Sequence, residues 1–321
     1  MSEMSDYGFV TRSFSTSFSK ALLAILTTFG LLCWGAFLRH DAWGLLPEAF
    51  APRLRIEFFD VGQGDSILVR TPRGRSYLID GGADVSTEQA EAVKRVRIQD
   101  VLARRGIRHL DGIVVTSRHN DHLGGIIQVL RNFSVGRVFD SGDTFEGVTF
   151  ADYQALLKQK RISRQRVSAG DRLDWGGELV VEAVSPAPEA SSWPSACEDD
   201  RSIALMVRYG QSAIILSGEL SQRGQREAAR FGRGVEARVI KLPKHASADS
   251  LDQTFLDAVH PLYGIISLGR NNPFGYPAST TLELLEKRGI KLFRTDRNGT
   301  VVLTAGGHAP ADFIFEVDRN L

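Results

Sequence analysis

An uncharged apolar segment, residues 21–38 (ALLAILTTFGLLCWGAFL), lies between Lys20 and Arg39. As a helix it would reach roughly 27 Å, close to the hydrocarbon thickness of a membrane. A buried core helix would carry polar positions at helical spacing, yet only Thr27 and Thr28 interrupt this segment. A cleaved secretory signal is the other alternative, but residues 1–20 make a long leader and no A-x-A-like cleavage site follows. We therefore expect an uncleaved single-pass transmembrane anchor, whose orientation the evenly split basic residues leave undecided.

The remaining sequence is typical of a folded α/β domain. We expect an N-terminal tail over 1–20, the anchor over 21–38, a tether over 39–53 and one domain over 54–321. A net charge of +1 with 24% charged residues excludes a disordered chain or a basic nucleic-acid wrapper. With only two cysteines, Cys33 in the apolar segment and Cys197 in a polar loop, we expect no disulfide and no cysteine-based zinc cluster.

Period-two alternation from Leu54 to Phe58 predicts a strand, followed by the glycine-rich turn 60–65 and strands near 67–69 and 77–79. Further on, the pattern predicts helices and strands in alternation. The expected helices are 88–105, 124–131, 221–231, 251–259 and 279–288. The expected strands are 113–115, 137–139, 179–184, 203–207, 213–216, 237–242, 263–268, 291–294 and 300–304. The first part of the domain is predicted to contain mainly strands, and the later part a mixture of strands and helices. This order favours two sheets covered by helices over one doubly wound sheet.

Residues 116–125 (TSRHNDHLGG) concentrate the candidate chemistry. His119, Asp121 and His122 follow a predicted buried strand and precede a Gly-Gly helix start. Imidazole and carboxylate groups suit zinc, manganese or iron, and a strand-to-helix turn can direct such side chains toward one point. By spacing alone, a polar loop with incidental histidines explains the pattern equally well.

Several ordered segments carry a resemblance to a known family: FFDVGQGDSILV (58–69), YLIDGG (77–82), RGIRHLDGIVVTSRHNDHLGG (105–125), LGRNNPFGYP (268–277) and FRTDRNG (293–299). Together they resemble the metallo-β-lactamase-like domain of ComEC-type DNA-uptake (competence) proteins, over about residues 54–304. The resemblance implies an αββα sandwich with a metal site at one edge, between the two sheets. It also implies hydrolysis of DNA or another phosphodiester through metal-bound water.

The family's His-x-(His or Asp)-x-Asp-His motif, which in most members serves two metals, matches here at His119, Asp121 and His122. Its first histidine is Ser117, a poor ligand for zinc or manganese. Asp121 and His122 are the residues we expect to carry catalysis, and the resemblance gives Asp80 the role of bracing the metal loop.

Three further positions depart from the family. The Thr-Gly-Asp turn ends in Glu219, His-His-Gly-Ser begins Lys244-His245, and Gly-His-Pro contains Tyr276. Asp199 or Asp200 stands where relatives often carry Asn, and either could supply a carboxylate or cap the loop. With these departures, His119, Asp121, His122, Glu219 and His245 are the candidate ligands.

We expect the candidate ligands to hold one zinc or manganese ion, or none, rather than two. Two hypotheses stay open: a membrane-anchored metal-dependent hydrolase, or a degenerate membrane-tethered binding or scaffold module of the same fold. One span cannot form a DNA channel, so a transport role would need a separate channel protein. By analogy with the relatives, the domain is expected on the extracytoplasmic side.

Overall fold

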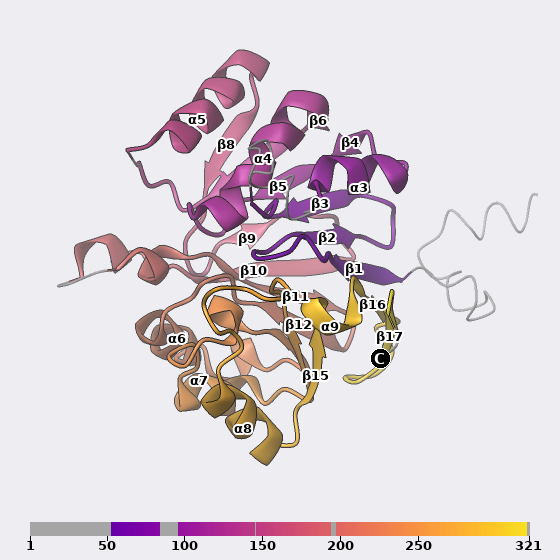
Figure 1. Cartoon of the computed structure of the whole chain (residues 1–321), viewed down its shortest axis with the longest axis vertical. Coiled ribbons are helices and arrows are strands. Elements are labelled where there is room, and N and C mark those ends of the chain that lie inside the picture. Colours follow the sequence, from indigo (N-terminus) through magenta and orange to yellow (C-terminus); the bar gives the residue numbers. More distant parts are fainter. Residues whose placement is uncertain (1–52, 84–95, 145, 194–196, 320–321) are drawn as a thin grey trace, which may run out of the picture. The chain divides into compact units, whose positions relative to one another are not determined.

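The computed structural model describes residues 53–83, 96–144, 146–193 and 197–319, which lie in one compact unit beginning at Arg53. Two sheets pack face to face, and helices cover the outer face of each (Figure 1). The predicted αββα sandwich is therefore confirmed.

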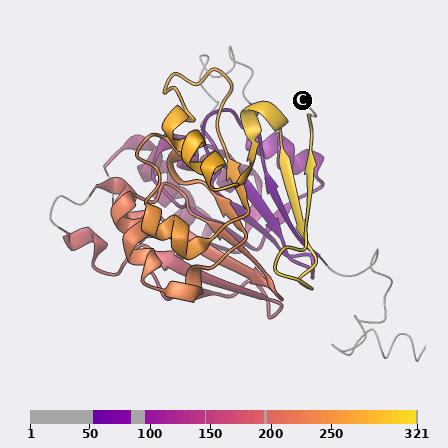
Figure 2. The same ribbon diagram turned by 90° about the horizontal axis from the view of Figure 1, so that it is seen from below.

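The first sheet has eight strands in the order β17-β16-β1-β2-β3-β5-β7-β8. Its members are β1 (Leu54–Phe58), β2 (Ile67–Arg70), β3 (Ser76–Ile79), β5 (Gly112–Val114), β7 (Arg137–Asp140), β8 (Ser163–Arg166), β16 (Val301–Ala305) and β17 (Phe313–Val317). Strands from β17 to β3 run antiparallel, whereas β3, β5, β7 and β8 run parallel. Figure 2 shows the C-terminal strands β16 and β17 (yellow) beside the first strand β1 (indigo). Strands from both ends of the domain therefore lie next to each other in one sheet.

The second sheet repeats this division in the order β15-β14-β13-β12-β11-β10-β9. Strands β12 to β15 are parallel, and β9 to β12 are antiparallel. Its members are β9 (Arg172–Leu173), β10 (Leu179–Ser185), β11 (Ala204–Tyr209), β12 (Ser212–Leu216), β13 (Val239–Lys241), β14 (Tyr263–Ile266) and β15 (Lys291–Arg294). A small parallel pair, β4 (His109–Leu110) and β6 (Ser134–Val135), lies apart from both sheets.

Three apolar clusters hold the layers together. Alternate residues of the strands, such as Phe58 and Val181, meet between the sheets. Helices α3 (Ile98–Arg104), α4 (Asn120–Asn132) and α5 (Val148–Lys160) cover the first sheet. Helices α6 (Gln222–Ala229), α7 (Gln253–Val259) and α8 (Ser279–Lys287) cover the second, and α9 (Thr295–Asn298) joins β15 to β16. Fully buried side chains such as Phe255 each contribute about 1.5–3 kcal/mol.

The parallel halves of the two sheets position the candidate site. Segments that follow β3, β5, β12, β13 and β14 carry its polar residues. Because carboxyl ends of neighbouring parallel strands meet at one edge of a sheet, these segments come together from both sheets. The sandwich thus brings residues distant in sequence to a single edge.

The predicted elements agree with the structure except at a few places. The elements that were not predicted are helices α5 and α9 and strands β4, β6, β8, β9 and β17. In α5, Phe150, Tyr153 and Leu157 are nevertheless buried at helical spacing. Of the helix predicted over 88–105, residues 98–104 form α3, residues 96–97 are not helical, and residues 88–95 lie outside the described residues. Cys197 is exposed and has a free thiol, whereas Cys33 lies outside the described residues.

The predicted tail over 1–20, anchor over 21–38 and most of the tether over 39–53 lie outside the described residues. Within the ranges that the structure does describe, no helix combines the length and apolarity needed to cross a membrane. The anchor therefore stays a prediction.

Candidate metal centre

His122 stands at the start of α4 and is fully buried. Its Nδ1 lies 2.7 Å from Asp80 Oδ2, and Asp80 also accepts hydrogen bonds from the backbone NH (2.8 Å) and the hydroxyl of Thr116. Because Nδ1 is held by Asp80, Nε2 is directed at Glu219 Oε1, 3.4 Å away. The bracing role predicted for Asp80 thus has a direct geometric basis: this carboxylate orients the imidazole.

His245 is oriented in the same way from the second sheet. It follows β13 in a left-handed backbone conformation with φ of 48°, and its Nδ1 lies 2.7 Å from the carbonyl oxygen of Ser267. A carbonyl can only accept, so Nδ1 donates, and the Nε2 of the neutral ring carries the lone pair. That Nε2 lies 3.3 Å from Asp121 Oδ2 and 3.6 Å from Glu219 Oε1.

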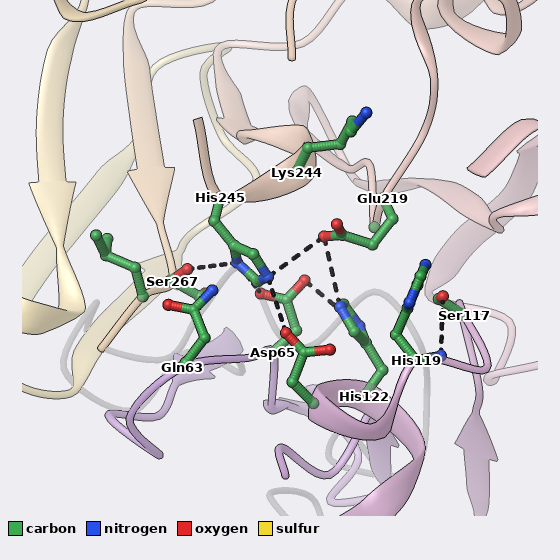
Figure 3. A network of polar contacts seen from close by, with 12 residues as sticks. Gln63, Asp65, Ser117, His119, His122, Glu219, Lys244, His245 and Ser267 are labelled. Atoms are coloured by element: carbon green, nitrogen blue, oxygen red, sulfur yellow. Dashed lines mark hydrogen bonds and ion pairs between the residues drawn. The ribbon is translucent and has the colours of Figure 1, made fainter. Parts of the chain in front are cut away.

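These side chains form what we call the donor cluster: Asp121, His122, Glu219 and His245. Figure 3 shows the rings of His122 and His245 turned toward the Glu219 carboxylate. Ligand atoms of Asp121, His122 and His245 lie within 4.8 Å of one another. His122 Nε2, His245 Nε2 and Glu219 Oε1 are buried and have no hydrogen-bond partner among the described residues. Buried polar atoms without partners are costly, so their convergence fits a divalent cation.

Charges inside the donor cluster are strongly coupled. Burial raises the pKa of Glu219, but His245, His122 and Lys241 outweigh it and hold that pKa at about 2. Burial likewise raises the pKa of Asp121, yet the neighbouring histidines bring it well below its ordinary value. Both histidines have raised pKa values, because their contacts with carboxylates outweigh burial. A bound cation would therefore meet two ionised carboxylates and replace imidazole protons.

A buried lysine beside the donor cluster was missed in the sequence. Lys241, at the end of β13, is fully buried. Its ammonium pairs with Asp65, donates to the carbonyl of Gly218 (3.1 Å) and lies 3.9 Å from Glu219 Oε1. The signal was a single charge within the apolar stretch of residues 239–242, VIKL. Asp65, in the glycine-rich turn before β2, is the counter-ion of Lys241.

The other candidate residues form a second group, which we call the lysine cluster: Ser117, His119, Asp199 and Lys244. His119 Nε2 lies 3.2 Å from Asp199 Oδ1, and Lys244 Nζ lies 3.3 Å from Asp199 Oδ2 and 2.8 Å from Asp249 Oδ2. Ser117 Oγ accepts a hydrogen bond from the backbone NH of His119. Figure 3 shows Lys244 directed away from the donor cluster and His119 on the far side of His122. The Lys244 ammonium thus neutralises the carboxylate of Asp199, which the sequence suggested as a possible ligand.

The structure also shows the surroundings of the Asp199–Asp200 pair and of Tyr276. Asp200 caps the turn before β11, where it accepts from the backbone NH of Cys197 (2.8 Å) and from the hydroxyl of Ser221. Asp199 is therefore the member of this pair that faces the site. Tyr276 packs its ring against His245, with centroids 6.4 Å apart.

Comparison with known proteins places this geometry in a family. The chain matches the metallo-beta-lactamase superfamily over residues 59–270, and it belongs to that superfamily. Its relatives include ComE operon protein 3 of Bacillus subtilis (strain 168), 29% identical over 294 residues. Another is competence protein ComA of Neisseria gonorrhoeae, 28% identical over 289 residues. The predicted resemblance to the domain of ComEC-type proteins is thereby confirmed.

These matches cover 88% and 89% of this chain but only 36% and 38% of the two relatives. The chain thus spans little more than a third of the length of these proteins. Among solved structures, CmlA, a diiron beta-hydroxylase from Streptomyces venezuelae, aligns with a TM-score of 0.50 and 15% identity. That alignment covers 75% of this chain and 52% of CmlA, and it bears on the fold alone.

Proposed function

We propose that this chain is a metal-dependent phosphodiesterase that acts on DNA with one zinc or manganese ion held by the donor cluster. The observation that carries the proposal is the convergence of the three unpartnered buried atoms, His122 Nε2, His245 Nε2 and Glu219 Oε1. Two imidazoles and two carboxylates form a donor set suited to such an ion. Asp121, with its side chain 30% exposed, leaves the centre accessible.

A divalent cation bound there supplies a Lewis acid that polarises a phosphoryl oxygen and makes water a competent nucleophile near neutral pH. The chain's own residues prepare the site for it. Asp80 and the carbonyl of Ser267 hold the two imidazoles in their ligating orientation. Lys241 balances the charge of Asp65 beside Glu219, so the donor cluster does not carry an extra unpaired carboxylate.

The lysine cluster supports a one-metal centre. A two-metal hydrolase uses a second cation to stabilise the attacking and leaving oxygens, whereas here the Lys244 ammonium pairs with Asp199, so this carboxylate is not free to bind a cation. Contacts with Asp249 and Asp199 outweigh burial and raise the pKa of Lys244, so this ammonium stays charged at neutral pH. We propose that Lys244 neutralises Asp199 and thereby excludes a second cation from this side of the site.

DNA as the substrate is supported by the relatives, of which one is a competence protein by its printed name. Because the chain covers about a third of their length, three further statements belong to the proposal. The segment 21–38 anchors the chain in a membrane, the domain lies on the extracytoplasmic side, and a separate channel protein carries the DNA across.

A scaffold without catalysis is the second candidate, and the ion pairs of the lysine cluster favour it. His119 and Asp199 satisfy each other, and Ser117 is engaged with the local backbone. In that case the donor cluster would be a remnant that binds no ion.

Metal analysis combined with a nuclease assay distinguishes the two candidates. The full chain, purified in detergent, is loaded with manganese or zinc and assayed on linear DNA and on bis(p-nitrophenyl) phosphate. We expect hydrolysis that is abolished by chelation and by Asp121→Ala with His122→Ala. A matched control is His109→Ala, which alters an exposed histidine of β4. Failure to take up metal, or full activity in the double variant, would contradict the hydrolase.

A further inference from the structure

A cavity of about 290 Å³ opens beside the donor cluster and reaches the carboxylate of Asp121. An aromatic face, two amide side chains and the Asp121 carboxylate meet in this cavity. Its lining residues are Gln63, Ala83, Asn120, Asp121, Pro273 and Phe274. Whatever fills this cavity lies directly next to the reacting centre.

Phe274 is the most exposed aromatic side chain that the structure describes, with 60% of its surface accessible. Phe231 is the next, at 40%, and does not line the cavity. An aromatic ring left open to water at the mouth of a site gains free energy when a flat partner covers it.

Phe274 is connected to the donor cluster by a row of rings. Its ring stacks on that of Tyr276, with centroids 5.5 Å apart and planes 19° from parallel. The Tyr276 ring in turn packs on His245. A group stacked on Phe274 would therefore be connected through Tyr276 to His245 of the donor cluster.

Hydrogen bonds within the loop that carries Phe274, and from this loop to neighbouring segments, restrain its backbone. The Asn272 amide donates to the carbonyl of Tyr276 (2.8 Å) and accepts from the backbone NH of Tyr276 (3.0 Å), which closes the loop around Phe274. The backbone NH of Ala278 donates to Ala246 next to His245 (2.9 Å), and the NH of Gly269 donates to the Gln63 side chain (3.3 Å). These hydrogen bonds restrain the backbone of the loop that carries the ring, which lowers the entropic cost of binding.

We propose that Phe274 is a stacking platform for an unpaired nucleobase adjacent to the scissile phosphate, so that the substrate is single-stranded DNA or a frayed end. This inference rests on the proposed phosphodiesterase function. Bases stack on exposed aromatic rings without regard to sequence, and amides such as those of Gln63 and Asn120 can hydrogen-bond base edges. Bases within a duplex already have both faces covered, so the platform selects against them.

Fluorescence anisotropy tests the platform without requiring turnover. The labelled ligand is a 12-nucleotide oligothymidylate with phosphorothioate linkages, which resist hydrolysis, and the full chain is loaded with manganese. Loss of one base–aromatic stack predicts that Phe274→Ala weakens binding roughly 5- to 100-fold. Phe274→Trp should retain the affinity, and Phe231→Ala is the matched control with no expected change.

The comparison ligand is an abasic strand with the same backbone. Phe274→Ala should leave binding of the abasic strand and of a blunt duplex unchanged. An equal loss for the abasic strand, or no loss for the oligothymidylate, would overturn the platform. Hydrolysis of bis(p-nitrophenyl) phosphate by the wild type would in either case leave the proposed function standing, whereas its absence would count against that function alone.

Discussion

The donor cluster and the lysine cluster lie side by side and both contain histidine and carboxylate groups, yet their polar atoms are paired differently. In the donor cluster, His122 Nε2, His245 Nε2 and Glu219 Oε1 face one another, and none of them has a hydrogen-bond partner among the described residues. In the lysine cluster, the equivalent groups are already neutralised, because Lys244 and His119 share the carboxylate of Asp199. Within the proposed one-metal centre, this ion pairing leaves Asp199 unavailable to a second cation.

The largest expected effect is the difference in folding stability between variants of Lys241 and of Lys244. Lys241→Met should destabilise the fold by about 3–5 kcal/mol, because it leaves Asp65 buried without its counter-ion. Lys244→Met should change stability by less than about 1 kcal/mol, since Lys244 and Asp249 are partly solvated. Urea unfolding followed by circular dichroism measures both. Equal effects would mean that the two ammonium groups play the same role.

A smaller effect, on metal affinity, is expected when the carboxylate that orients His122 is changed. Asp80→Asn should lower metal affinity roughly 10- to 100-fold, because the imidazole of His122 loses the carboxylate that orients it. Isothermal titration with zinc measures the affinity, and Asp152→Asn, on the exposed face of α5, is the matched control. Unchanged affinity in Asp80→Asn would show that His122 does not ligate.

The smallest effect is expected in the lysine cluster. His119→Ala should alter metal affinity by less than about twofold, because His119 Nε2 pairs with Asp199 and Glu198 and not with a donor atom of the donor cluster. The same titration serves as the measurement. A loss comparable to that in Asp80→Asn would make His119 a ligand, and the division into two clusters would then be wrong.

The sequence predicted the layers better than the site. Alternating apolar residues in strands such as β10 predicted the sandwich, because one face of each strand had to be buried. Helix α5 was overlooked even though Phe150, Tyr153 and Leu157 follow a helical period. The motif around Asp121 and His122 was found because its residues are adjacent in sequence.

What the sequence could not provide is the partner of each side chain. The pairing of Lys241 with Asp65 joins the end of β13 to the turn before β2, which belongs to the other sheet, and no local pattern encodes it. Similarly, only the fold distinguishes Asp199, which faces Lys244, from Asp200, which caps a turn. Charge pairing across the two sheets depends on tertiary packing, and the number of metal positions depends on that pairing.

Metal stoichiometry tests the central claim most directly. The full chain, saturated with manganese or zinc, freed of excess ion and analysed by inductively coupled plasma mass spectrometry, should retain one ion per chain. A variant with Ser117→His and Lys244→His, which adds two donors and removes the ammonium, should retain a second ion. Two ions in the wild type would contradict the role of Lys244, and none would contradict the donor cluster as a metal site.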